Sequence, residues 1–284
     1  MRASILPTIL AVPGAWHTVE SFDSVKKIFT ERNYDFVSQN APGVVDANST
    51  VTGDAASLRT NLLGPLVEAG KDVIVMMHSY GGMYGSQAVE GLSKRERTQS
   101  GKQGGVISLI YVSAVTPLAG QSTLNMMGTD VQHLPSFVDY NVRKFTPLCC
   151  AAGPPRCIHV RVFVNQNLNQ QDNTGFVTFT GAKEVMYHDI PDDVASHYIS
   201  LLQPQSLNSM NTPVTYSPLT DPNFEGTAGY VLCGADRVVP LAGQEQYAAI
   251  GGIKRTILVD QASHAFFATA ANDTVNAVLE LSQT

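Results

Sequence analysis

The sequence predicts an α/β fold: a mostly parallel central sheet with helices on both faces and a cap inserted between two of its strands. Short buried apolar runs alternate with amphipathic helical patterns near both ends of the chain. This alternation is typical of parallel strands joined by crossover helices. Between Pro117 and about Leu219 the alternation stops and Pro, Asn and Gln become frequent, which predicts the cap.

Three parts of the chain follow from this break. Residues 1–116 are expected to form the N-terminal part of the core, residues 117–219 the cap, and residues 220–284 the C-terminal part of the core. A chain of 284 residues buries roughly three-quarters of its unfolded surface on folding. It therefore needs no disulfide or metal to hold a core together.

The apolar runs give the core strands in chain order: Thr8–Val12, Tyr34–Ser38, Asp72–Met77, Gly105–Ser113, Gly229–Cys233 and Thr256–Val259. The helical patterns between and after them cover Thr18–Arg32, Gly53–Ala69, the stretch from Ser79 to about Arg97, and Thr269–Ser282. Two features are expected within the cap: a hairpin of Ile158–Asn165 with Gly175–Thr180, and a partly helical segment Glu184–Leu202 broken at Pro191.

Composition excludes several classes of protein. Hydrophobic residues make up 44% of the chain and charged residues 15%, which favours a packed globule over a disordered chain. The net charge is −6 and no basic stripe is present, so no nucleic-acid partner is expected. The densest basic segment, Ser93–Lys102, is interpreted as a solvated helix end and loop.

No apolar stretch approaches the roughly 20 residues that span a bilayer, so no membrane partner is expected. The apolar N-terminal run is interpreted as the first core strand and not as a signal peptide. The four cysteines, Cys149, Cys150, Cys157 and Cys233, give no clear disulfide framework. A cytoplasmic location is therefore expected.

The stretch "VIVMMHSYGGMYG", residues Val73–Gly85, predicts a buried strand, a sharp turn that carries Ser79, and a helix. A nucleophile elbow has this form and the pattern G-x-S-x-G. Here Met77 stands in the place of the first glycine. Because the strand and helix of an elbow approach closely, we expect Met77 to point away from the helix.

A serine hydroxyl needs a base to become nucleophilic, and the base needs an orienting acid. Asp236 follows the strand "GYVLC", and His264 follows the strand "TILV". With Ser79, these residues give the chain order serine, acid, histidine at three strand ends, where ligands bind in open parallel sheets. Asp221 and Asp260 are rival acids, although neither occupies a turn between a buried strand and a new helix.

An acyl-transfer site also needs donors for the developing oxyanion. The expected donors are the backbone N–H of Tyr80 and that of Ala15 in the loop "AVPGAWH", where Gly14 permits a tight turn. A simple Pro–Gly turn is the alternative for this loop. Trp16 and His17 are candidates for the substrate pocket, and for Trp16 simple core packing is an equal alternative.

The remaining histidines have no metal-like spacing, and no phosphate-binding loop is present, so no metal and no cofactor is expected. His78 is interpreted as a packed core residue, and Cys233 as a buried, inert thiol.

The motifs "VPGAWH", "HSYGG", "YVLCGADRVVP" and "LLQPQSL" together resemble the α/β-hydrolase superfamily, and within it the plant methylesterase and hydroxynitrile lyase family and its fungal relatives. The resemblance implies an α/β-hydrolase fold. Lyases of this family carry lysine after the catalytic histidine and threonine in the oxyanion loop. This chain has Ala265 and Gly14 at those positions, which favours ester hydrolysis.

The predicted function is therefore a cofactor-free serine hydrolase that cleaves a small, mostly apolar ester or lactone through an acyl-enzyme. Two alternatives stay open. One is a non-hydrolytic enzyme on the same scaffold, such as a lyase, cyclase or dehydratase of secondary metabolism. The other is a small-molecule receptor that retains the triad.

Overall fold

A parallel sheet forms the centre of the computed structural model, which describes residues 6–131, 175–179 and 181–283. Among these residues the sheet has six strands in the order β2-β1-β3-β4-β7-β8, and every neighbouring pair is parallel. The strands are β1 (Thr8–Val12), β2 (Phe36–Ser38), β3 (Asp72–His78), β4 (Gly105–Val112), β7 (Ala228–Cys233) and β8 (Thr256–Val259). The predicted fold class is confirmed.

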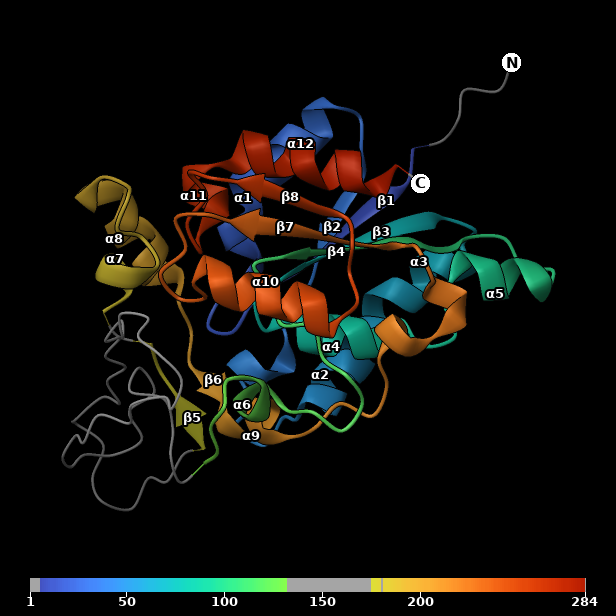
Figure 1. Ribbon diagram of the computed structural model, residues 1–284, viewed down its shortest axis with the longest axis horizontal. Coiled ribbons are helices and arrows are strands. Elements are labelled where there is room, and N and C mark those ends of the chain that lie inside the picture. The colour runs from blue at the N-terminus through green and yellow to red at the C-terminus, as the bar shows by residue number, and fades with distance from the viewer. Residues whose placement is uncertain (1–5, 132–174, 180, 284) are drawn as a thin grey trace.

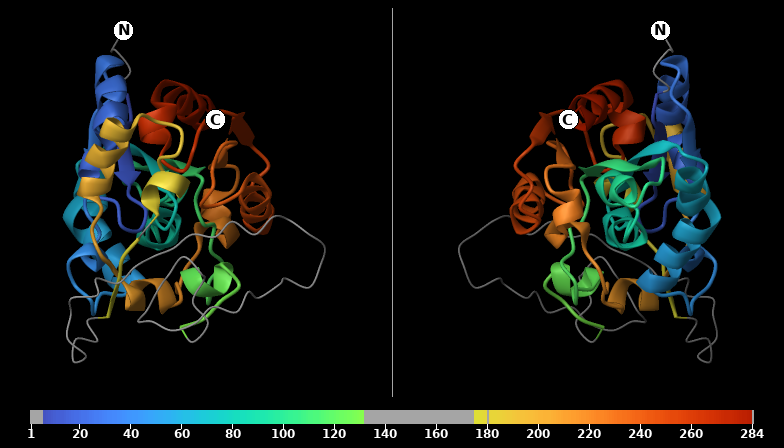
Figure 2. Two further views of the ribbon diagram at one scale, coloured as in Figure 1. Left: turned by 90° about the vertical axis from the view of Figure 1, so that its left-hand side faces the viewer. Right: turned by 90° about the vertical axis from the view of Figure 1, so that its right-hand side faces the viewer.

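Helices cover both faces of this sheet (Figure 1). One face carries α1 (Asp23–Glu31), α11 (Phe266–Thr269) and α12 (Ala271–Ser282), and α1 packs against α12. The other face carries α2 (Val51–Leu58), α3 (Gly64–Glu68), α4 (Gly81–Ala88), α5 (Lys94–Gln99) and α10 (Leu241–Ile250). The two side views show the sheet between these layers (Figure 2).

Two of the predicted helices are interrupted. The segment Gly53–Ala69 becomes α2, a π-helical segment Arg59–Leu63, and α3. The helix after Ser79 ends at Ala88, because Gly91 adopts a left-handed φ of 68°. Helix α5 then begins anew, with the Ser93 hydroxyl accepting a hydrogen bond from the Glu96 N–H.

The basic segment Ser93–Lys102 is not wholly solvated. Arg97 is buried, and its guanidinium donates to Glu68 Oε1 at 2.7 Å and to the carbonyl oxygens of Val67 and Gly104 at 2.9 and 3.0 Å. A planar guanidinium with five donors can satisfy several acceptors at once. Arg97 therefore ties α5 to the end of α3, which the expectation of a solvated segment missed.

The insertion between β4 and β7 lies at the side toward which the β7 and β8 arrows point (Figure 1). Its described elements are α6 (Thr123–Met126), β5 (Phe176–Val177), α7 (Ala182–Val185), α8 (Asp192–Leu201), β6 (Gln205–Ser206) and α9 (Leu207–Asn211). Pro191 precedes α8, which confirms the predicted break. Strand β5 pairs antiparallel with β6, whereas Ile158–Asn165 lies outside the described residues, as do Cys149, Cys150 and Cys157.

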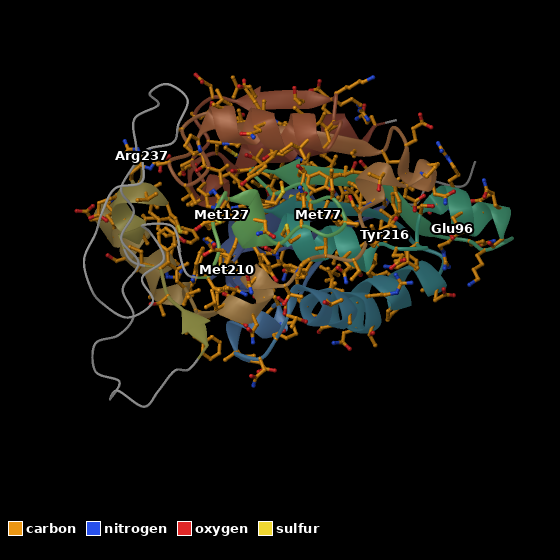
Figure 3. All side chains as sticks on the ribbon, turned by 60° about the horizontal axis from the view of Figure 1, so that its bottom comes forward. Met77, Glu96, Met127, Met210, Tyr216 and Arg237 are labelled. Atoms are coloured by element: carbon orange, nitrogen blue, oxygen red, sulfur yellow. The ribbon has the colours of Figure 1, made fainter. Side chains whose placement is uncertain are left out.

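Met77 does not point away from the elbow helix, so that prediction is wrong. Met77, labelled in Figure 3, is fully buried. A Cβ placed on Gly85 of α4 would lie 2.8 Å from both Cγ and Sδ of Met77. The missing side chain at Gly85 therefore provides the space that the first glycine of the elbow pattern usually provides.

In the parts of the chain that the structure describes, no helix is both long enough and apolar enough to cross a membrane.

Candidate active site

Ser79 occupies a strained turn between β3 and α4. Its φ is 52°, a left-handed value that non-glycine residues rarely adopt. The Val115 N–H donates to the Ser79 carbonyl oxygen at 3.1 Å, and the Gly82 N–H donates to the same oxygen at 3.0 Å. Backbone strain of this kind persists where the surroundings fix it, and it is frequent at functional sites.

The three predicted side chains meet at the carboxyl ends of their strands. Ser79 Oγ lies 3.1 Å from His264 Nε2, and His264 Nδ1 lies 2.7 Å from Asp236 Oδ2. Asp236 and His264 are both buried, while Ser79 is partly exposed. Asp236 Oδ1 accepts hydrogen bonds from the N–H groups of Val238 and Val239 at 2.7 and 2.9 Å. The carboxylate is thus held in place, and His264 presents Nε2 to the hydroxyl.

A second serine, Ser113, lies on the other side of the imidazole. Its hydroxyl donates to Asp236 Oδ2 at 2.5 Å and is 3.5 Å from His264 Nδ1. Ser113 is fully buried and has a φ of 42°. Because Nδ1 carries the proton that it donates to Asp236, this nitrogen cannot accept a proton from Ser113. The geometry therefore makes Ser79, and not Ser113, the serine next to a free basic nitrogen.

The sequence analysis missed Ser113. The signal that could have found it is its place directly after β4, since a polar residue at this end of a parallel strand faces the same edge as Ser79 and Asp236.

Replacing Ser113 by Gly should move the acid side of the pH profile of kcat/KM to higher pH by about 0.5 to 1 unit. The substitution removes one donor from the Asp236 carboxylate, which then favours the protonated imidazole of His264 more strongly. Glycine suits the left-handed backbone at this position, so the fold is retained. Hydrolysis of p-nitrophenyl acetate between pH 4 and 9 measures the shift; an unchanged acid limb would rule out this influence of Ser113.

The loop after β1 passes directly beside the serine. A Cβ on Gly14 would lie 2.8 Å from Ser79 Cβ, so only glycine fits this close approach. The Tyr84 hydroxyl donates to the Pro13 carbonyl oxygen at 3.0 Å, and His17 Nδ1 donates to the Ala15 carbonyl oxygen at 3.0 Å. With its carbonyl held on the far side, the Ala15 peptide is fixed beside Ser79. Its role as an oxyanion donor stays a prediction.

Tyr80, the other predicted donor, precedes the first residue of α4. The first N–H groups of a helix have no acceptor within the helix, and they carry its positive dipole end. The Tyr80 N–H therefore belongs to a group of amides suited to a negatively charged oxygen. Its role as an oxyanion donor also stays a prediction.

Trp16 and His17 are both buried. Trp16 Nε1 donates to the Val177 carbonyl oxygen at 3.0 Å, and the Tyr187 hydroxyl donates to His17 Nε2 at 3.2 Å. Burial lowers the pKa of His17 to about 3, so its ring is neutral at working pH. These contacts connect the oxyanion loop to the insertion and favour packing for both residues. Their contact with a substrate stays a prediction.

His78 packs its ring against that of His264, with centroids 4.7 Å apart. Both of its ring nitrogens lack a hydrogen-bond partner within the described residues, and burial lowers its pKa well below the usual value. His78 is therefore neutral and acts as a packing surface, as predicted. Burial likewise raises the pKa of the Cys233 thiol well above its ordinary value, in agreement with an inert thiol.

No group of three or more His, Cys, Asp or Glu side chains suited to a metal ion occurs within residues 6–131, 175–179 and 181–283. His133 and His159 lie outside these ranges. Of the rival acids, Asp221 accepts from the Tyr216 hydroxyl at 2.6 Å, and Asp260 is exposed. Asp236 is the carboxylate that contacts His264.

Comparisons with known proteins agree with this architecture. The model of the alpha/beta hydrolase family matches residues 9–278. An alpha/beta hydrolase, nvfD, of Aspergillus novofumigatus is 25% identical over 261 residues, covering 91% of this chain and 90% of the relative. The crystal structure of polyneuridine aldehyde esterase superposes with a TM-score of 0.69 at 13% identity, covering 98% of this chain and 99% of that one.

A methylesterase from Arabidopsis has a TM-score of 0.67 at 16% identity, covering 97% of this chain and 98% of that one. At these identities the solved structures show the shared fold, whereas the family model spans nearly the whole chain. The plant methylesterase structures and the fungal relative are the kinds of protein that the sequence motifs resemble. Together, the family match and the fold establish that this chain belongs to the alpha/beta hydrolase family.

Proposed function

We propose that this protein is a serine hydrolase that cleaves a small carboxylic ester or lactone by way of an acyl-enzyme. The observation that carries the proposal is the hydrogen-bonded series Ser79 Oγ, His264 Nε2, His264 Nδ1 and Asp236 Oδ2, with distances of 3.1 and 2.7 Å at its two links. These links match the relation of nucleophile, base and orienting acid in serine hydrolases. The esterase and methylesterase structures that share the fold support the same class of substrate.

In the first half of the reaction, Ser79 Oγ attacks the ester carbonyl carbon while its proton passes to His264 Nε2. The carbonyl oxygen becomes an oxyanion, which the N–H groups of Tyr80 and Ala15 stabilise. The tetrahedral intermediate collapses, the C–O bond to the alcohol breaks, and His264 returns its proton to the departing alkoxide. The products of this half are the free alcohol and an ester of Ser79.

In the second half, water attacks the acyl carbon and gives a proton to His264 Nε2. The bond between the acyl carbon and Ser79 Oγ then breaks, and His264 returns the proton to Ser79. Asp236 stays ionised throughout and stabilises the imidazolium that forms twice in the cycle. Every proton is accounted for by His264, and no further group is needed.

A small set of p-nitrophenyl esters with acyl chains of two to eight carbons tests the class of reaction. We expect multiple turnovers, with a transient acyl-enzyme whose mass equals that of the chain plus the acyl group. A chain that binds such esters without turnover would support the receptor alternative. Turnover of a substrate without an ester, with no covalent intermediate, would support the non-hydrolytic alternative.

A further inference from the structure

Asp54 of α2 is a buried carboxylate whose presence the triad does not explain. It is 0% exposed and makes no ion pair with any of the described residues. Its Oδ1 accepts from the Gly43 N–H at 2.8 Å and from the Ser49 hydroxyl at 2.7 Å. Its Oδ2 accepts from the Tyr80 hydroxyl at 2.7 Å. A carboxylate without a cation is costly to bury, and burial raises the pKa of Asp54.

Tyr80 links this carboxylate to the reaction centre. Its backbone follows the strained Ser79, and its N–H is the proposed oxyanion donor. Its side chain is buried, so the phenol is anchored at Asp54 while the amide faces the site. The position of the amide therefore depends on contacts at both ends of one residue.

The same polar cluster reaches the second half of the proposed oxyanion hole. The Tyr80 hydroxyl also lies 3.4 Å from the Ser209 carbonyl oxygen. Gln205 Nε2 donates to Ser209 Oγ at 2.6 Å, and Gln205 Oε1 accepts from the Trp16 N–H at 3.4 Å. Trp16 directly follows Ala15. Both proposed donors are therefore adjacent to one buried cluster that includes the insertion residues Gln205 and Ser209.

We propose that Asp54 is a positioning residue, which fixes the Tyr80 N–H at the oxyanion hole through its hydrogen bond with the Tyr80 hydroxyl. Asp54 does not touch the substrate, because its oxygens are occupied and the side chain is fully buried. The proposal rests on the proposed hydrolase function, since it assigns a reason for the geometry of that site. Loss of one oxyanion donor costs about 10²- to 10³-fold in kcat, so displacing one should cost about 10- to 100-fold.

Asp54→Asn, Tyr80→Phe and the double variant test the proposal. In the double variant, the Asn oxygen still accepts from Gly43 and Ser49, and the Phe ring needs no acceptor. The double variant is thus the one best able to fold, and it is used if a single variant does not melt cooperatively. Tyr111→Phe is the matched control, because the buried Tyr111 hydroxyl bonds to Ser86 Oγ at 2.7 Å and not to the site.

Three quantities are measured for each folded variant: kcat and KM for p-nitrophenyl acetate, the rate constant for labelling by a fluorophosphonate, and the melting temperature. We expect kcat and the labelling rate to fall about 10- to 100-fold with KM within about twofold in all three variants, and the double variant to match the single ones. Tyr111→Phe should lower the melting temperature and leave both rates unchanged.

The outcomes separate this proposal from the one on which it rests. If the unaltered protein is labelled at Ser79 but the Asp54 and Tyr80 variants react at its rate, the positioning role is wrong and the triad stands. Equal losses of rate in Tyr111→Phe would likewise reduce Asp54 to a structural role. If the unaltered protein is not labelled at Ser79, the proposed function itself is wrong.

Discussion

Ser79→Ala should lower ester turnover by about 10⁴-fold or more, with the fold and the melting temperature retained. The hydroxyl is the atom that attacks, so no other group in the site replaces it. Residual activity would reflect the oxyanion donors and binding alone. The measurement is kcat/KM for p-nitrophenyl acetate, using protein free of any contaminating esterase.

Ser113→Gly is the control for this substitution. It removes the other hydroxyl near His264, which lies 3.5 Å from Nδ1, and activity at pH 8 should stay within about tenfold of the unaltered protein. The two serines thus give opposite expectations at the same histidine. An active Ser79→Ala protein together with an inactive Ser113→Gly protein would reverse the assignment of the nucleophile.

Asp236→Asn should lower kcat by about 10⁴-fold. Each carboxylate oxygen of Asp236 faces two donors: the N–H groups of Val238 and Val239 at one, and His264 Nδ1 and the Ser113 hydroxyl at the other. An asparagine must place its NH₂ group against one of these pairs. If the NH₂ faces His264, Nδ1 becomes the acceptor, and Nε2 then carries the proton and cannot take one from Ser79.

Asp260→Asn is the matched control, because Asp260 also follows a core strand but is exposed. It should leave kcat within about twofold, as surface substitutions generally have small effects. Comparable losses in both variants would show that Asp236 acts through the charge of the region and not through its contact with His264.

The fold was predictable from the sequence because its signals are local. The buried runs and the order serine, acid, histidine at three strand ends need no knowledge of distant contacts, since parallel strands bring their carboxyl ends to one edge. The single helix expected after Ser79 was wrong in extent. There Gly91 and the Ser93 cap ended one helix and began another, and both are local signals that the helical pattern obscured.

The parts that could not be predicted depend on contacts between distant residues. Met77 was expected to avoid α4, and Gly85, eight positions later, accommodates it instead. Asp54 meets Tyr80 across 26 positions, and Ser113 meets Asp236 across 123. A buried acid or serine in a sequence has no local signature, because its role depends on which side chain the fold places opposite it.

The most direct test of the account is the site of covalent modification. After reaction with a fluorophosphonate, proteolysis and mass spectrometry should place the adduct on the peptide that contains Ser79, and the adduct should be absent from Ser79→Ala and retained in Ser113→Gly. A modification mapped to Ser113, or none on either serine in the folded protein, would contradict the assignment of Ser79 as the nucleophile.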